Sequence, residues 1–194
     1  MKCVKCHVNF CWVCLEVMNT YNEPHICHKY DPANSVAEDD SEKRALFTVT
    51  RFEGHEMARI FTANQYKHFD TEKFIETYWF IDEMNDPDIM RGALQTLLTS
   101  RDFIKHSYVK ILFLKEDDDS IIELSKKVKK KTKKLYEDHH ACLEMLTERL
   151  SYYAEINLHQ HYELRGQYEI NLHFRRLAFY TASVVKYMER MICL

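Results

Sequence analysis

Apolar residues recur along most of the chain at intervals of three and four, which is the spacing that places them on one side of an α-helix. A first helix is predicted from a capping box at Ser35–Glu38 towards His68. Its apolar face is predicted to carry Val49, Phe52, Ile60 and Phe61. A second helix is predicted over Thr71–Met84, and the turn-forming sequence Asn85-Asp86-Pro87 ends it.

The same spacing predicts three further helices. Asp86 followed by Pro87 is a favourable start, because Pro at the first helical position lacks only an N–H that would have no partner there, and this helix is predicted to reach Leu114. A second capping box, Ser120–Glu123, opens a long amphipathic helix. Its apolar residues have near-heptad spacing: Leu124, Val128, Leu135, Cys142, Leu146 and Tyr153. A break near Asn157–His161 precedes a final helix, so the predicted fold class is mainly α.

Composition agrees with a helical protein. The 194 residues include only three Gly and three Pro, which are too few turn formers for the many hairpins of a β-sandwich or barrel. The net charge of -3 provides no overall basic surface for nucleic acid. No apolar run approaches the roughly 20 residues of a membrane-spanning helix, so we expect a protein of the cytoplasm or nucleus without a membrane segment.

The cysteines are unevenly distributed. Five of the seven fall within the first 27 residues, and composition changes near Asp31–Asn34. We therefore predict a small module over residues 1–30 and a helical domain over residues 31–194. In a reducing compartment, clustered cysteines are more often metal ligands than disulfides.

The spacing of these cysteines predicts zinc binding. Two Cys-x2-Cys pairs occur within fourteen residues, and each pair can present two thiolates to one tetrahedral zinc ion. One complete set of four ligands is available: Cys11, Cys14, His25 and Cys27. A half site is left with two ligands: Cys3 and Cys6. The alternative grouping places both Cys-x2-Cys pairs around one ion, which requires the four residues between the pairs to turn back sharply.

Three motifs resemble a known family. One is similar to the second RING of RING-between-RING ubiquitin ligases: Met1-x-Cys3-x2-Cys6-x4-Cys11-Trp12-x-Cys14, then His25 and Cys27-x2-Tyr30. Two others resemble the helical Ariadne domain that follows this RING in the Ariadne subfamily: Arg51-Phe52-x2-His55, and Leu97-Leu98-x2-Arg101 leading to Ser107-Tyr108. The chain departs from the family at Val17-Met18, where a Trp is usual, and in the short spacing of His25 and Cys27, which makes His28 an alternative ligand.

The resemblance implies a function for the parent protein. Members of this family accept ubiquitin from a conjugating enzyme as a thioester on a catalytic cysteine and pass it to a substrate lysine. That cysteine lies just before the position matched by Met1, so no catalytic residue is named in this chain, and we expect it to be inactive alone. The resemblance leads us to expect a C-terminal part of such a ligase, as a gene fragment, an internally initiated product or a truncated paralogue. The alternative is a non-catalytic zinc-binding helical adaptor for cullin-RING complexes or for the parent ligase.

The resemblance also implies that the antiparallel helical domain is autoinhibitory. In Ariadne ligases it folds back on the second RING and masks the catalytic cysteine until a modified cullin-RING complex binds. A Phe-Glu pair contributes to this masking, and Phe61-Thr62 aligns with it. Phe61 is therefore a candidate autoinhibitory contact, and the alternative is an ordinary packed aromatic residue.

A lysine-rich stretch is not explained by the resemblance. Lys126–Lys134 holds seven lysines in nine residues. Nuclear import, an acidic partner and nucleic acid are compatible with such a run, and the alternative is a solvated helix face. The run contains no aromatic residue on which a base could stack, which disfavours nucleic acid.

Overall fold

The structure is a computed structural model that describes residues 8–10, 17–18, 40–78, 87–113, 123–155 and 167–193. The described part contains two short strands and five helices. The strands are β1 (Asn9–Phe10) and β2 (Val17–Met18), which pair antiparallel. The helices are α1 (Asp40–Lys67), α2 (Thr71–Tyr78), α3 (Pro87–Phe113), α4 (Glu123–Glu155) and α6 (Gln167–Ile192). The predicted mainly α class is confirmed.

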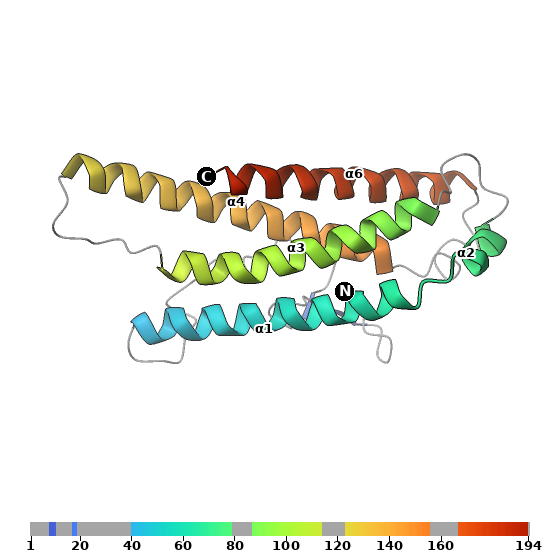
Figure 1. The fold of residues 1–194 in the computed structure, drawn as a ribbon, viewed down its shortest axis with the longest axis horizontal. Coiled ribbons are helices and arrows are strands. Elements are labelled where there is room, and N and C mark those ends of the chain that lie inside the picture. Colours follow the sequence, from blue (N-terminus) through green and yellow to red (C-terminus); the bar gives the residue numbers. More distant parts are fainter. Residues whose placement is uncertain are drawn as a thin grey trace.

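Four long helices run side by side in alternating directions, with α3 in the middle of the assembly (Figure 1). Helix α3 packs against α1, α4 and α6, and α4 also packs along α6. The apolar core lies among α3, α4 and α6, where several side chains have no exposed surface: Leu97, Ile104, Leu143, Leu150, Phe174, Leu177 and Val184. Ala58 is the one apolar residue of α1 that is buried among the described residues.

Local signals in the sequence mark the starts of α2 and α3, whereas the predicted capping residues Ser35–Glu38 and Ser120 lie outside the described residues. Helix α3 begins at Pro87 as expected and ends at Phe113, one residue before the predicted end. Helix α2 begins at Thr71, where Asp70 acts as its N-cap because the backbone N–H of Lys73 donates to Asp70 Oδ1 at 3.0 Å. The predicted continuation of this helix to Met84 lies outside the described residues beyond Tyr78. None of the described helices combines the length and apolar character needed to cross a membrane.

The predicted packing face of α1 is wrong. Val49, Ile60 and Phe61 are 52%, 43% and 39% exposed, and Phe52 is half-buried. The face that packs on α3 is mostly polar and consists of Thr48, Arg51, His55, Ala58 and Thr62. His55 can occupy this interface because it finds partners across it, as described below, and Thr62 donates to the backbone oxygen of Ala58 within α1.

The predicted face of α4 is partly confirmed, because Leu146 and Tyr153 pack against the core, but the most buried residues lie one position further along, a rotation of about 100° on an α-helix. Leu135 is 43% exposed, whereas the next residue, Tyr136, is buried. The observed buried face keeps heptad spacing: Tyr136, His140, Leu143, Thr147 and Leu150. The pattern of apolar letters missed this face because three of its buried residues are polar, namely His140, Thr147 and the adjacent Glu144.

Candidate functional site: a polar network joining three helices

The predicted zinc ligands all lie outside the described residues: Cys3, Cys6, Cys11, Cys14, His25, Cys27 and the alternative ligand His28. Zinc binding by residues 1–30 therefore stays a prediction. In the described ranges, no three His, Cys, Asp or Glu side chains are grouped so that they could hold a metal ion. The polar chemistry of the described part gathers instead between α1, α3 and α4.

His55 is at the centre of this polar network. Its Nε2 lies 2.9 Å from Oε1 of Glu144 on α4, and its Nδ1 lies 3.2 Å from Nη1 of Arg101 on α3. A guanidinium can donate hydrogen bonds but cannot accept them, so Nδ1 is the acceptor. The arrangement therefore favours a neutral ring whose Nε2–H donates to Glu144. His55 and Arg101 have no exposed surface.

The network continues on both sides of His55. Arg101 Nη1 donates to Oε1 of Glu148 at 2.5 Å, and the hydroxyl of Tyr108 donates to Oε2 of Glu144 at 2.8 Å. The ring of His140 packs edge-on against Tyr108 with 4.3 Å between centroids. Both carboxylate oxygens of Glu144 thus accept a hydrogen bond. The chain of contacts begins at Glu148 on α4, passes through Arg101 on α3 and His55 on α1, and returns to α4 at Glu144.

Glu144 is a buried anion that its neighbours hold in the ionised form. Burial by itself raises the pKa of this carboxyl, but the hydrogen bond from His55 and the positive charge of Arg51 lower the pKa to about 2. Glu144 is therefore charged at neutral pH, and removal of its partners would leave a charge inside the protein.

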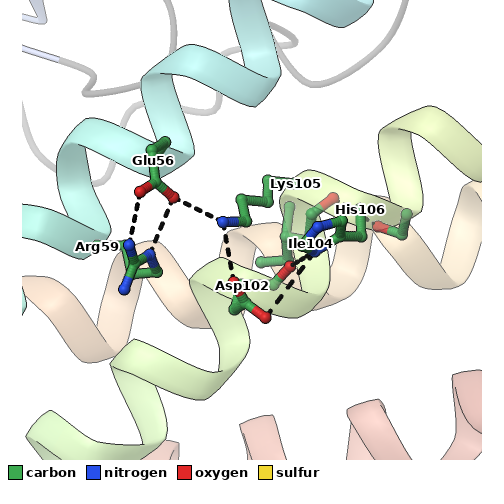
Figure 2. A network of polar contacts seen from close by, with 7 residues as sticks. Glu56, Arg59, Asp102, Ile104, Lys105 and His106 are labelled. Carbon is green, nitrogen blue, oxygen red and sulfur yellow. Dashed lines mark hydrogen bonds and ion pairs between the residues drawn. The ribbon is translucent and has the colours of Figure 1, made fainter.

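A second set of contacts joins α1 to α3 at the edge of this interface (Figure 2). Arg59 binds Glu56 with two hydrogen bonds of 2.9 and 2.6 Å, and Lys105 Nζ lies 2.7 Å from Glu56 and 2.9 Å from Asp102. His106 Nδ1 lies 2.8 Å from the backbone oxygen of Asp102. The hydrogen bonds from Arg59 and then Lys105 lower the pKa of Glu56 to about 2.

These contacts hold α1 in position against α3 and α4. Both oxygens of Glu144 accept hydrogen bonds from neighbouring side chains, and both ring nitrogens of His55 have partners, so the ring offers no nitrogen to a substrate. Their burial also keeps solvent from reaching them. The network therefore holds the helices together, and it determines which face of α1 points outward.

The motifs that suggested a family supply half of this network. Arg51, His55, Arg101 and Tyr108 belong to the two helical motifs, and the structure brings them into one buried region. The residues that the sequence did not single out are on α4: His140, Glu144 and Glu148. Their spacing of four residues is a usable signal, since it places three ionisable residues on one face of a helix that must be buried.

The outward face of α1 carries large apolar side chains, which we call the α1 apolar stripe: Leu46, Val49, Met57, Ile60 and Phe61. At about 100° per residue these positions fall within an arc of about 120°, on the side opposite His55. The interpretation of Phe61 as an ordinary core residue is wrong, because Phe61 is 39% exposed. Its proposed regulatory role is not decided by this exposure.

No family model matches the chain. Among curated proteins, the chain is 24% identical to human E3 ubiquitin-protein ligase ARIH1 over 169 residues, which cover 80% of the chain and 27% of ARIH1. It is 23% identical to E3 ubiquitin-protein ligase dbl4 of Schizosaccharomyces pombe over 164 residues, which cover 80% of the chain and 30% of dbl4. E3 ubiquitin-protein ligase ariadne-1 of Drosophila melanogaster matches with 23% identity over 158 residues, covering 77% of the chain and 29% of that protein.

The curated relatives are Ariadne-type RING-between-RING ubiquitin ligases. The resemblance seen in the motifs is thereby confirmed, and the alignment extends over about 80% of the chain. The chain spans less than a third of the length of these Ariadne-type relatives.

Proposed function

We propose that this chain is the C-terminal regulatory part of an Ariadne-type ubiquitin ligase. The observation that carries the proposal is its alignment with such ligases over about 80% of its length. The parent ligase would supply the cysteine that accepts ubiquitin from a conjugating enzyme. A zinc-bound module at residues 1–30 and a partnership with cullin-RING complexes, in the cytoplasm or nucleus, belong to the same proposal.

The regulatory role would be performed by α1. The buried network fixes the rotation of this helix, so the α1 apolar stripe is held outward on a rigid support. Exposed apolar groups on a rigid helix form a surface suited to a protein partner. We propose that this surface, which includes Phe61, packs on the second RING and restrains ubiquitin transfer.

A chimeric ligase tests this role. This chain would replace the aligned C-terminal region of human ARIH1, so that the second-RING sequence and the helices come from the same protein. Replacing Met57, Ile60 and Phe61 by Ser should raise the rate of ubiquitin transfer about fivefold or more, because a restrained state loses apolar contact area. The rate would be measured as discharge of a ubiquitin-loaded conjugating enzyme.

The matched control uses three exposed apolar residues of α6: Tyr168, Phe179 and Ile192, each replaced by Ser. This variant removes as many exposed apolar side chains from a different helix, and its rate should stay within about twofold of the starting chimera. Equal rates for the α1 and α6 variants would contradict a restraining role for the α1 apolar stripe.

The purified chain alone should form no ubiquitin thioester. Its described cysteines are Cys142, which is half-buried on α4, and Cys193, which is exposed beside the end of α6. Incubation with a ubiquitin-loaded conjugating enzyme, followed by electrophoresis with and without reductant, measures this. A reductant-sensitive adduct on the chain would contradict the view that the catalytic cysteine belongs to the parent ligase.

A further inference from the structure

The N-terminal part of α4 extends past the helices that pack against it (Figure 1). Two contacts lie near the base of this extension. Lys110 Nζ of α3 lies 4.3 Å from the ring centroid of Tyr136, and the ring centroid of Tyr187 on α6 lies 6.0 Å from that of His139. Beyond these contacts α3 continues for only about 5 Å and α6 for about 8 Å, whereas α4 continues for about 20 Å, at about 1.5 Å per residue. We call residues 123–134 the α4 overhang.

The α4 overhang coincides with the lysine-rich run. Its seven lysines are Lys126, Lys127, Lys129, Lys130, Lys131, Lys133 and Lys134. The sequence has no acidic residue between Glu123 and Glu137, and Lys131 and Lys134 are exposed. On a helix with about 100° per residue, the seven lysine positions fall within an arc of about 200°. The overhang is thus a concentrated positive charge on a chain whose net charge is -3.

This charge opposes the stability of its own helix. Four pairs of these lysines are three residues apart and four pairs are four residues apart, which are the spacings at which like charges repel on a helix surface. Positive charges in the first turns are also unfavourable because the helix dipole is positive there. The backbone of the overhang also runs past the ends of α3 and α6 (Figure 1). A feature that breaks local rules without a gain in packing indicates a function outside the fold.

We propose that the α4 overhang binds an acidic segment of a partner polypeptide. Such a segment would neutralise the repulsion among the lysines and stabilise the helix on which it docks. The overhang is about 18 Å long, which matches about five or six residues of an extended peptide at about 3.3 Å per residue. Lysine suits carboxylate-rich surfaces of variable geometry, because its ammonium is a compact charge on a flexible stem.

Nucleic acid and anionic membranes fit the overhang less well. Residues 123–134 contain no Arg for bidentate binding of phosphate, no Asn or Gln for base edges and no aromatic residue for stacking. A membrane-bound helix also needs a broad face of large apolar residues, and this segment offers only Leu124 and Val128.

The proposal can be tested with a dye-labelled peptide of about 12 glutamates. Its binding to the full chain would be measured by fluorescence anisotropy at about 50 and 300 mM NaCl. Replacing Lys126, Lys127, Lys130 and Lys131 by Gln should weaken binding about tenfold at the lower salt concentration. Replacing the same four lysines by Arg should keep affinity within about threefold, since the charge is preserved. Binding should also weaken at the higher salt concentration.

The control variant replaces four lysines elsewhere by Gln: Lys43, Lys67, Lys73 and Lys186. It removes the same charge, so an equal loss of affinity would overturn the proposal. Tighter binding of a duplex of about 12 base pairs, or of vesicles with about 30% phosphatidylserine, would overturn the assignment to a polypeptide. Hydrogen exchange locates the site: bound peptide should slow amide exchange within residues 123–134, and slowing confined to α6 would also overturn the proposal.

Discussion

His55 shows how one buried side chain can join three helices. Each ring nitrogen has a different partner, Arg101 on α3 and Glu144 on α4, while the residue itself belongs to α1. Because Arg101 can only donate, the ring needs no proton on Nδ1, and its Nε2–H is free to donate to the negatively charged Glu144. At the scale of the residue, cohesion here depends on complementary donors and acceptors rather than on apolar area.

The importance of Glu144 can be tested by replacing it with Ala. The variant removes the acceptor used by His55 and Tyr108 and leaves the positive charge of Arg51 without part of its compensation. We expect the free energy of unfolding to fall by about 3–5 kcal/mol, measured by urea denaturation. In contrast, Asp102→Ala removes a carboxylate that is 54% exposed and should cost less than about 1 kcal/mol. Equal losses in the two variants would refute the special role of the buried anion.

Glu144 also predicts how stability depends on pH. The folded-state pKa of about 2 lies below the ordinary value of 4.5, so the unfolded chain binds this proton first as the pH falls. The stabilisation is complete above pH 4.5 and is lost as the pH falls towards 2, with a total size of about 3 kcal/mol at about 1.4 kcal/mol per pKa unit.

The measurement is a series of urea unfolding curves between about pH 2 and 6. Glu144→Gln should be less stable than the natural chain at pH 6 and should lose less stability on acidification. Glu56→Gln is the comparison, because the pKa of Glu56 is also about 2 but solvent screens this partly exposed group. If the free energy of unfolding fell equally steeply on acidification in Glu144→Gln and in the natural chain, Glu144 would not be the source of the pH dependence.

The helices themselves were largely predictable, whereas the faces they bury were not. Pro87 and the Asp70 cap mark helix starts through interactions within one turn, so a single sequence contains that information. The buried face of α1 depends on Glu144, which is 89 residues away along the chain from His55. Periodicity alone selects the side with more apolar letters, and on α1 that side is the exposed one.

The central position of α3 predicts that its core residues matter most for stability. Ile104 has no exposed surface, and Ile104→Ala should lower the free energy of unfolding by about 2–5 kcal/mol through a cavity between helices. Ile75 on α2 is 50% exposed and provides a control with the same side chain. Ile75→Ala should cost less than about 1 kcal/mol, also measured by urea denaturation. A larger loss at Ile75 than at Ile104 would mean that α3 is not the centre of the core.

At the scale of the whole molecule, two kinds of stabilisation are expected to coexist. The helices bury an apolar core and a polar network that involve residues 40–193, whereas the cysteine module over residues 1–30 is predicted to depend on zinc. Zinc binding remains a prediction that rests on ligand spacing alone, because Cys-x2-Cys pairs carry their geometry locally. The sequence could not predict the polar network, whose members meet only after three helices have assembled.

Zinc content tests the module separately from the helices. The purified chain should contain about one zinc ion, and Cys11→Ser with Cys14→Ser should remove it. Replacing Cys142 and Cys193 by Ser should leave the zinc content unchanged, since both cysteines lie outside the predicted module. Chelation should shift the thermal unfolding midpoint of the helical bundle by less than about 3 °C, because its core is formed by other residues. Zinc lost equally from both variants would argue against the predicted ligands.

The shared hydrogen bonds between α1, α3 and α4 constrain which substitutions can accumulate during evolution. Since His55, Arg101, Tyr108 and Glu144 share donors and acceptors, a replacement acceptable at one position depends on what stands at the others. Substitutions here should therefore occur in compensating sets spread over three helices. Among homologous chains, correlated changes at these positions would record the same geometry that the hydrogen bonds show in this one.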